Sequence, residues 1–121
     1  MRSLITVLLA ATPLMAACAS FPPPTQRLAD AEAAGRSARE VGADGQPVAK
    51  LEVKLADEEI AQAKALMANG DNRRADFVLM RARADAELAL ALAREQHANA
   101  EIQRAIEQSR TTAAATQGGR P

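Results

Sequence analysis

Residues 70–93 carry the clearest helical pattern in the chain and read GDNRRADFVLMRARADAELALALA. Gly70 is suited to end one helix in a left-handed conformation, and Asp71 or Asn72 to begin the next as its N-cap. No Pro or Gly follows until beyond Arg110, so we predict one helix about 60 Å long. One face of this helix alternates spacings of four and three residues, as a partner helix requires, and is mostly alanine: Ala75, Leu79, Ala82, Ala86, Ala89 and Ala93.

The segment from Pro47 to Asn69 predicts a second helix, with Pro in its first turn. Its apolar residues form a stripe at helical spacing: Val48, Leu51, Leu55, Ala56, Ile60, Ala63 and Met67, with Leu66 beside them. Because only a few residues join this helix to the next, the two must lie antiparallel.

The position of the turn at residues 70–71 sets the expected register of this hairpin. Large residues of the second helix then face small residues of the third: Leu55 faces Ala86, Leu51 faces Ala89 with Leu90 beside it, and Leu66 faces Ala75. The same register predicts two surface ion pairs, worth about 0–1 kcal/mol each: Glu58 with Arg83, and Glu59 with Arg81.

A shorter helix precedes the hairpin, from Gln26 to Val41, and Gly42 ends it. It is the simplest cover for a second apolar stripe on the third helix: Phe77, Ala84, Leu88, Ala91 and Leu92. We therefore predict an all-α fold, an elongated antiparallel helical hairpin with a preceding shorter helix, in one domain over residues 26–110.

Beyond Glu95 the third helix outruns the second. Its apolar residues there are bare unless the first helix or another copy of the chain packs on them: Ala98, Ile102, Ala105 and Ile106. Two interpretations stay open, a homo-oligomer or coiled coil formed by self-association and a partly solvated helix end. Residues 111–121 are rich in Thr, Ala and Gly without periodicity, and we expect a disordered tail.

Composition excludes several classes of function. Fifteen basic residues balance fifteen acidic ones, so the chain lacks the net positive charge with which a nucleic-acid binder attracts phosphates. Trp and Tyr are absent, which leaves few aromatic side chains on which bases could stack. Alanine fills 30 of 121 positions, which leaves few large side chains to line a ligand pocket. His97 has no His or Cys partner, and the acidic run at residues 57–59 points in several directions from a helix. We expect no enzyme, no catalytic, cofactor or metal residues, and no small-molecule substrate.

The first 17 residues have the order of a signal peptide, with Arg2 before a short apolar run. Leu14-Met15-Ala16-Ala17-Cys18 resembles the bacterial lipobox, whose cysteine becomes a lipid-bearing N-terminus. Cys18 is the only cysteine, so lipidation explains an exported thiol that cannot form an internal disulfide. Two alternatives stay open: ordinary secretion after an Ala17-Cys18-Ala19 site, and an N-terminal anchor that is never cut.

The likeness to bacterial lipoproteins implies a membrane anchor of a diacylglyceryl group plus an N-acyl chain such as palmitate on Cys18. Several chains together anchor stably, whereas one binds marginally. Ala19 after the cysteine resembles the pattern of proteins sorted to the outer membrane. Residues 18–25, with three consecutive prolines, then form a semi-rigid tether.

Two further resemblances concern the helical part. Gly70 to Ala75, followed by Ala82, resembles the turn and second helix of a tetratricopeptide unit, although the chain holds no second copy. A longer set of positions resembles a family of short, Ala-rich bacterial lipoproteins with a single domain of unknown function, often encoded beside OmpA-like envelope proteins: Cys18, the prolines, Leu28, Ala31, Ala38, Gly42-Ala43, Pro47, Leu51, Ala61, Ala65-Leu66, Gly70-Asp71, Ala75, Ala82 and residues 85–89.

This resemblance implies a location in the envelope and no enzymatic activity. We therefore expect a structural or adaptor lipoprotein on the periplasmic face of the outer membrane, with an envelope protein or a second copy as its partner. The alternative is a soluble periplasmic module, tetratricopeptide-like, that binds proteins or acts as a chaperone.

Overall fold

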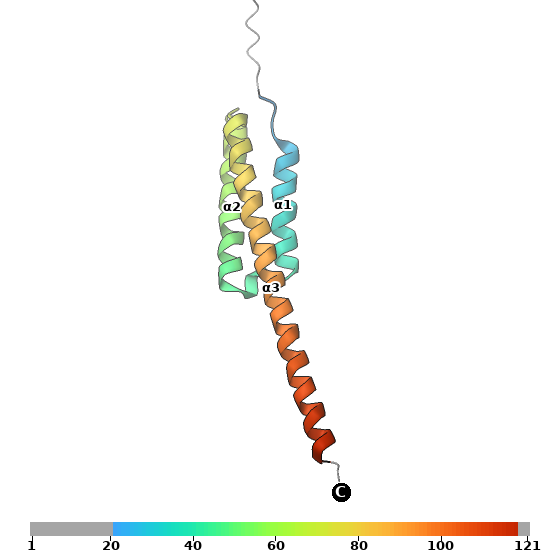
Figure 1. Ribbon diagram of the computed structural model, residues 1–121. Coiled ribbons are helices and arrows are strands. Elements are labelled where there is room, and N and C mark those ends of the chain that lie inside the picture. The colour runs from blue at the N-terminus through green and yellow to red at the C-terminus, as the bar shows by residue number, and fades with distance from the viewer. Residues whose placement is uncertain (1–20, 119–121) are drawn as a thin grey trace, which may run out of the picture.

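A computed structural model describes residues 21–118. The elements are α1 (Thr25–Glu40), a short 3-10 turn η1 (Ala43–Gly45), α2 (Pro47–Ala68) and α3 (Asn72–Gly118). Three helices form one bundle and α3 continues beyond it as a single rod (Figure 1). The predicted all-α hairpin with a preceding shorter helix is confirmed. The predicted signal peptide, Cys18 and the rest of residues 1–20, and residues 119–121 lie outside the described residues.

Both turns depend on glycine in the left-handed region. Gly42 has φ 92° and Gly70 has φ 77°, a conformation that a side chain with a Cβ disfavours. At the α2–α3 turn the amide of Asp71 donates to the carbonyl oxygen of Leu66 at 2.9 Å, which closes the end of α2. Pro47 begins α2 as expected, and the Gln46 side chain accepts from the amide of Ala49. The helix boundaries around both turns thus follow from local sequence.

The core is built mainly from alanine. All six residues of the predicted α3 face are buried, and Leu79 is the largest side chain that is fully buried among those described. We call this face the inner seam: Ala75, Leu79, Ala82, Ala86, Ala89 and Ala93. Two clusters of buried residues lie along it, one around Leu79 and Ile60 and one around Val53 and Ala89. Small side chains let the three helices approach closely, so the bundle is narrow and has little interior volume.

The face that α2 buries agrees with the prediction only in its second half, where Ala56, Ile60 and Ala63 are buried. Its buried residues are Ala49, Val53, Ala56, Ile60 and Ala63, whereas Val48, Leu51 and Leu55 are exposed, Leu51 at 53%. The prediction considered only α3 as a neighbour, but α1 also packs on α2. The buried face has to serve both neighbours, and alanines spaced seven apart allow the closest approach. The large-to-small pairing predicted for Leu51 and Leu55 is therefore wrong.

Of the two predicted ion pairs, one forms and the other does not. Glu59 pairs with Arg81 at 2.9 Å, as expected. The pair of Glu58 with Arg83 does not form: Glu58 lies 3.6 Å from Lys54 of its own helix. Arg83 instead approaches Glu87 at 2.7 Å and Asp30 of α1 at 3.6 Å, because α1 lies on that side of α3.

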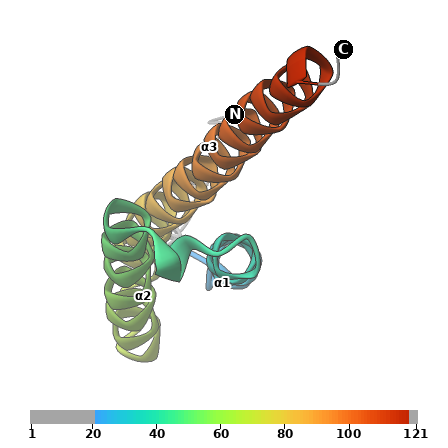
Figure 2. The same ribbon diagram turned by 90° about the horizontal axis from the view of Figure 1, so that it is seen from below.

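The first helix does not cover the second apolar stripe of α3. It packs on the hairpin through Ala31, Gly35 and Ala38, and contacts both α2 and α3 (Figure 2). Small residues on this face of α1 fit against the inner seam, so α1 completes a three-helix bundle. Phe77 remains 61% exposed and Leu88 47% exposed, since no element of the described chain lies over them.

The third helix extends further than predicted. It ends at Gly118 and not near Arg110, so the expected disordered tail is wrong for residues 111–118. Ala113 to Ala115 have the highest helix propensity, and the first glycine of this part of the chain is Gly118. The hydroxyls of Thr112 and Thr116 donate to carbonyl oxygens four residues earlier, at 2.8 and 2.9 Å. We call residues 98–118, which project beyond the bundle, the overhang (Figure 1).

Candidate functional site

The N-terminal tether is fastened to the hairpin turn. The Asn72 side-chain amide donates to the carbonyl oxygen of Phe21 at 2.9 Å, and Pro24 is buried. The sequence suggested Asn72 only as a helix cap, and its contact with the tether was not predicted. The carbonyl oxygen of Pro24 accepts from the amide of Leu28 at 3.1 Å, which joins the tether to α1. Whatever precedes Phe21 therefore enters the domain at the α2–α3 turn, the end opposite the overhang.

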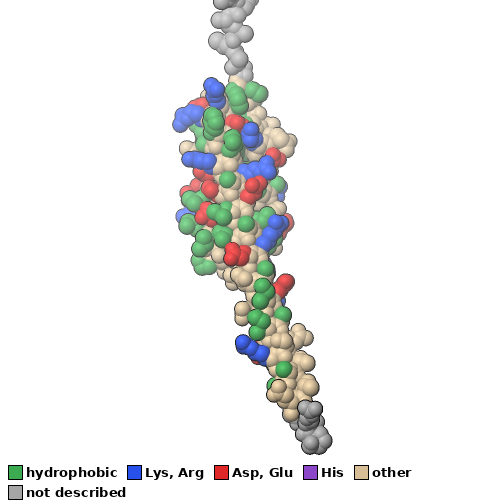
Figure 3. Space-filling model, in the orientation of Figure 1, with side chains coloured by type: hydrophobic (Ala, Val, Ile, Leu, Met, Phe, Trp, Pro, Cys, Tyr) green, Lys and Arg blue, Asp and Glu red, His purple; other side chains and the backbone are tan. Residues whose placement is uncertain are grey.

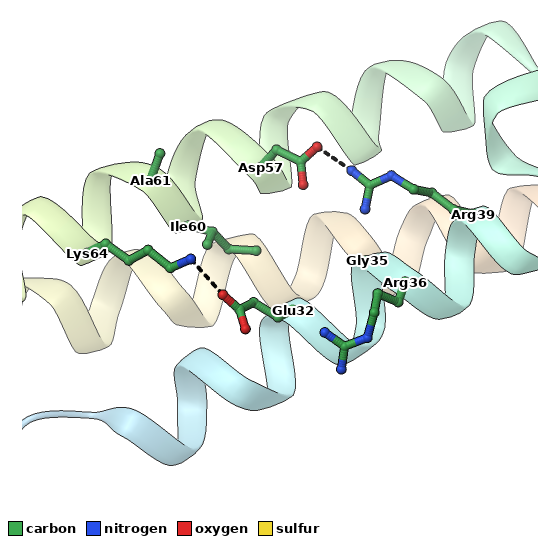
Figure 4. Close-up of a pocket in the computed structure, with 8 residues that line it drawn as sticks. All are labelled: Glu32, Gly35, Arg36, Arg39, Asp57, Ile60, Ala61 and Lys64. Atoms are coloured by element: carbon green, nitrogen blue, oxygen red, sulfur yellow. Dashed lines mark hydrogen bonds and ion pairs between the residues drawn. The ribbon is translucent and has the colours of Figure 1, made fainter.

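An open groove runs between α1 and α2 (Figure 4). Its volume is about 490 Å³, and its lining combines charged and small side chains: Glu32, Gly35, Arg36, Arg39, Asp57, Ile60, Ala61 and Lys64. Two ion pairs cross it, Lys64 with Glu32 at 2.7 Å and Arg39 with Asp57. These two ion pairs join α1 to α2 across the groove, and Arg36 beside them forms no ion pair with any described residue.

His97 has a structural role that the sequence did not reveal. Its Nε2 lies 2.6 Å from the carbonyl oxygen of Val41, the residue that caps the C-terminus of α1. A donor there satisfies one of the free carbonyls at the end of a helix. Within residues 21–118, no group of three or more His, Cys, Asp or Glu side chains is arranged to hold a metal ion.

The acidic run of α2 spreads over three directions, as its spacing predicts. Asp57 pairs with α1, Glu58 with Lys54, and Glu59 with Arg81 of α3. Glu59 is the most enclosed of these, with 18% of its side chain exposed, and its buried Oε2 has no hydrogen-bond partner. Burial raises the pKa of Glu59 above its ordinary value, Arg81 opposes that shift, and Asp85 adds to it. Glu59 of α2 and the carboxyl group of Asp85 on α3 therefore lie close together, beside the guanidinium of Arg81.

Exposed apolar side chains lie on α3 as well as on α2, where Leu51 and Leu55 are exposed. Phe77, Leu88 and Ile102 are exposed large side chains on α3. Apolar side chains continue from the bundle onto the overhang (Figure 3). A surface of this kind is typical of protein contacts. No helix within residues 21–118 has the length and hydropathy needed to cross a membrane.

The geometry defines a small helical protein with a fastened N-terminal tether, a narrow bundle and a projecting helix. Residues 26–105 match the family described as the domain of unknown function DUF4398, and the chain belongs to this family. The matched region begins in α1 and ends within the overhang, so it includes all three helices. Comparisons with curated proteins and with solved structures found no match. The expectation of a single domain of unknown function is confirmed.

Proposed function

We propose that this protein is a non-enzymatic lipoprotein, anchored by lipid on Cys18 to the periplasmic face of the outer membrane, where it acts as a structural or adaptor module. The observation that carries the proposal is the sequence around Cys18, the only cysteine, placed directly after an apolar segment and two alanines. A thiol at that position, followed by a proline-containing tether, matches what an N-terminal lipid anchor requires.

The arrangement of the helical domain supports this role. The tether meets the bundle beside Asn72, and the overhang leaves the opposite end (Figure 1). A chain held at its N-terminus thus presents its exposed apolar helix away from the point of attachment. The ion pairs and small residues of the groove between α1 and α2 are accounted for by helix packing, so the exposed surface of α3 is the better candidate for contact with a partner.

Intact mass and detergent partitioning of the chain expressed in a bacterium test the anchor. We expect the wild-type protein to start at Cys18, carry the added mass of several acyl chains and enter the detergent phase. The Cys18→Ser variant should lose both properties. A matched control, Cys18→Ser with Ser20→Cys, keeps one thiol two residues further along and should also remain without lipid.

The alternative function is a soluble periplasmic module that binds proteins or acts as a chaperone. Its supporting feature is the hairpin itself, in which Ala75 and Ala82 are fully buried after Gly70, as in a tetratricopeptide unit. A wild-type chain that is cleaved after Ala19, or that keeps a free Cys18 thiol, would contradict the lipoprotein proposal and favour this alternative.

A further inference from the structure

The outer face of α3 carries a second seam of alternating four- and three-residue spacing. We call it the outer seam: Ala84, Leu88, Ala91, Glu95, Ala98, Ile102 and Ala105. Every one of these residues is exposed, Leu88 at 47% and Ile102 at 55%. The seam starts on the bundle, opposite the inner seam, and continues without a break along the overhang. Such spacing is the signature of a helix that packs against another along its whole length.

We propose that two copies of this chain pair antiparallel along their outer seams. Alanine recurs at every seventh position of the seam, and the positions between hold Leu88, Glu95 and Ile102. In an antiparallel coiled coil, the alanine positions of one helix face the positions of the larger residues on the other helix. One alignment brings each larger residue onto an alanine of the second copy: Leu88 onto Ala105, Glu95 onto Ala98, and Ile102 onto Ala91. Alternation of large and small residues is what close packing requires.

Charge complementarity selects this alignment. It brings Arg94 of each copy beside Glu101 of the other, so two equivalent ion pairs flank the seam. Neither residue forms an ion pair within the described part of the chain. A parallel pair in register would instead stack Glu95 on Glu95 and bring Arg94 beside Asn99. Like charges that face each other are unfavourable. In the antiparallel pair Glu95 faces Ala98, and the two Glu95 positions lie about 4.5 Å apart along the axis, so it is the two ion pairs of Arg94 with Glu101 that favour this pair.

The same alignment explains the overhang. Residues 75–118 of each α3 lie beside the same residues of the other copy, an overlap of about 66 Å at 1.5 Å per residue. Each overhang then lies along the bundle of the second copy and covers Leu88. An isolated helix in water depends on such packing for most of its stability. This pairing needs no lipid, so it does not rest on the proposed function. It puts the two α2–α3 turns at opposite ends of the dimer, so two lipid anchors reach one membrane only where the long axis of the dimer lies along the membrane surface.

Disulfide trapping tests the register. Two differently tagged copies of the full chain are expressed together, one with Ala84→Cys and the other with Ser109→Cys, residues that the alignment places opposite each other. We expect a disulfide-linked dimer that carries both tags. Two copies that both carry Ala84→Cys should give none, because those positions lie about 37 Å apart in the antiparallel pair. The unsubstituted chain controls for Cys18. A crosslink between two Ala84→Cys copies, or none in any combination, would overturn the proposal.

Charge reversal tests the ion pairs. Arg94→Glu places a carboxylate beside Glu101 twice in each dimer, and we expect the trapped fraction to fall about fivefold or more, because two attractions are replaced by two repulsions. Arg94→Glu with Glu101→Arg restores both pairs with their signs exchanged and should recover the yield. Far-ultraviolet circular dichroism should show equal helix content in all variants. A double variant that traps as poorly as the single one contradicts this register.

Discussion

The two seams of α3 have the same alternating spacing and are both rich in alanine, yet only one of them is covered within the chain. The inner seam lies against α1 and α2, and all six of its residues are buried. The outer seam is exposed along its full length. Periodicity therefore identifies a face capable of packing, but which face packs within the chain is decided by the number of helices available. The two shorter helices cover one side of α3 and leave the other side exposed.

Truncation of a large residue on each seam gives the largest expected contrast. Leu79→Ala removes a fully buried side chain, and we expect the free energy of unfolding to fall by about 2–5 kcal/mol. Leu88→Ala removes an exposed side chain, and we expect a change within about 0.5 kcal/mol at protein concentrations where the chain is monomeric. Urea denaturation followed by circular dichroism measures both. Equal losses would mean that the outer seam is buried in the monomer.

Replacing one alanine of each seam by leucine should also change stability by different amounts, but the difference should be smaller than for the truncations. Ala82→Leu adds three carbons where the helices are in close contact, and overpacking of a core costs about 1–3 kcal/mol. Ala84→Leu, two residues away, adds the same atoms to an exposed position and should leave the stability of the monomer nearly unchanged. Thermal unfolding of the two variants at one concentration makes the comparison. A stable Ala82→Leu variant would show that the inner seam has room that the structure does not reveal.

The turn between α2 and α3 holds the inner seam in register, and its glycine can be tested in the same way. Gly70→Ala places a Cβ at φ 77°, a cost of about 1–2 kcal/mol even though no atom lies within 4 Å of that Cβ. Gly45→Ala is the matched control, because its position is equally open and its φ is not positive. Chemical denaturation should show Gly70→Ala as the less stable variant. Two variants of equal stability would contradict a turn that requires the left-handed conformation.

Local sequence was sufficient to predict the helices, and long-range packing was not. Gly42, Pro47 and Gly70 determine where helices end and begin through their own backbone preferences, so these boundaries were predicted correctly. The inner seam was predicted because its residues are all apolar and, apart from Leu79, all alanine. The second half of the buried face of α2 was predicted, but the burial of Ala49 and Val53 was not, because these two residues pack in a cluster with residues of α1 and η1.

In the candidate site too, features that follow from local spacing were predicted, whereas contacts between residues distant in the sequence were not. The spread of Asp57, Glu58 and Glu59 around α2 follows from helix geometry alone and was predicted. The contacts of His97 with Val41 and of Asn72 with Phe21 join residues more than 50 positions apart, and no periodic pattern marks them. Cys18 lies outside the described residues, so its lipidation stays a prediction from the sequence.

Glu58 and Glu59, adjacent acidic residues of α2, allow a test in which the expected change in stability is the smallest of the four. Burial raises the pKa of Glu59 in the folded protein above its unfolded value of about 4.3. Folding therefore favours the neutral form of the Glu59 carboxyl. The stability that this form contributes is fully present below the unfolded pKa and is lost as the pH rises through the folded pKa. We expect the free energy of unfolding of the wild type, relative to Glu59→Gln, to fall as the pH rises from about 4 toward 7. Glu58→Gln removes the same charge from an exposed position and controls for net charge. A relative stability that rises over this range would mean that the attraction of Arg81 outweighs the cost of burying the carboxylate.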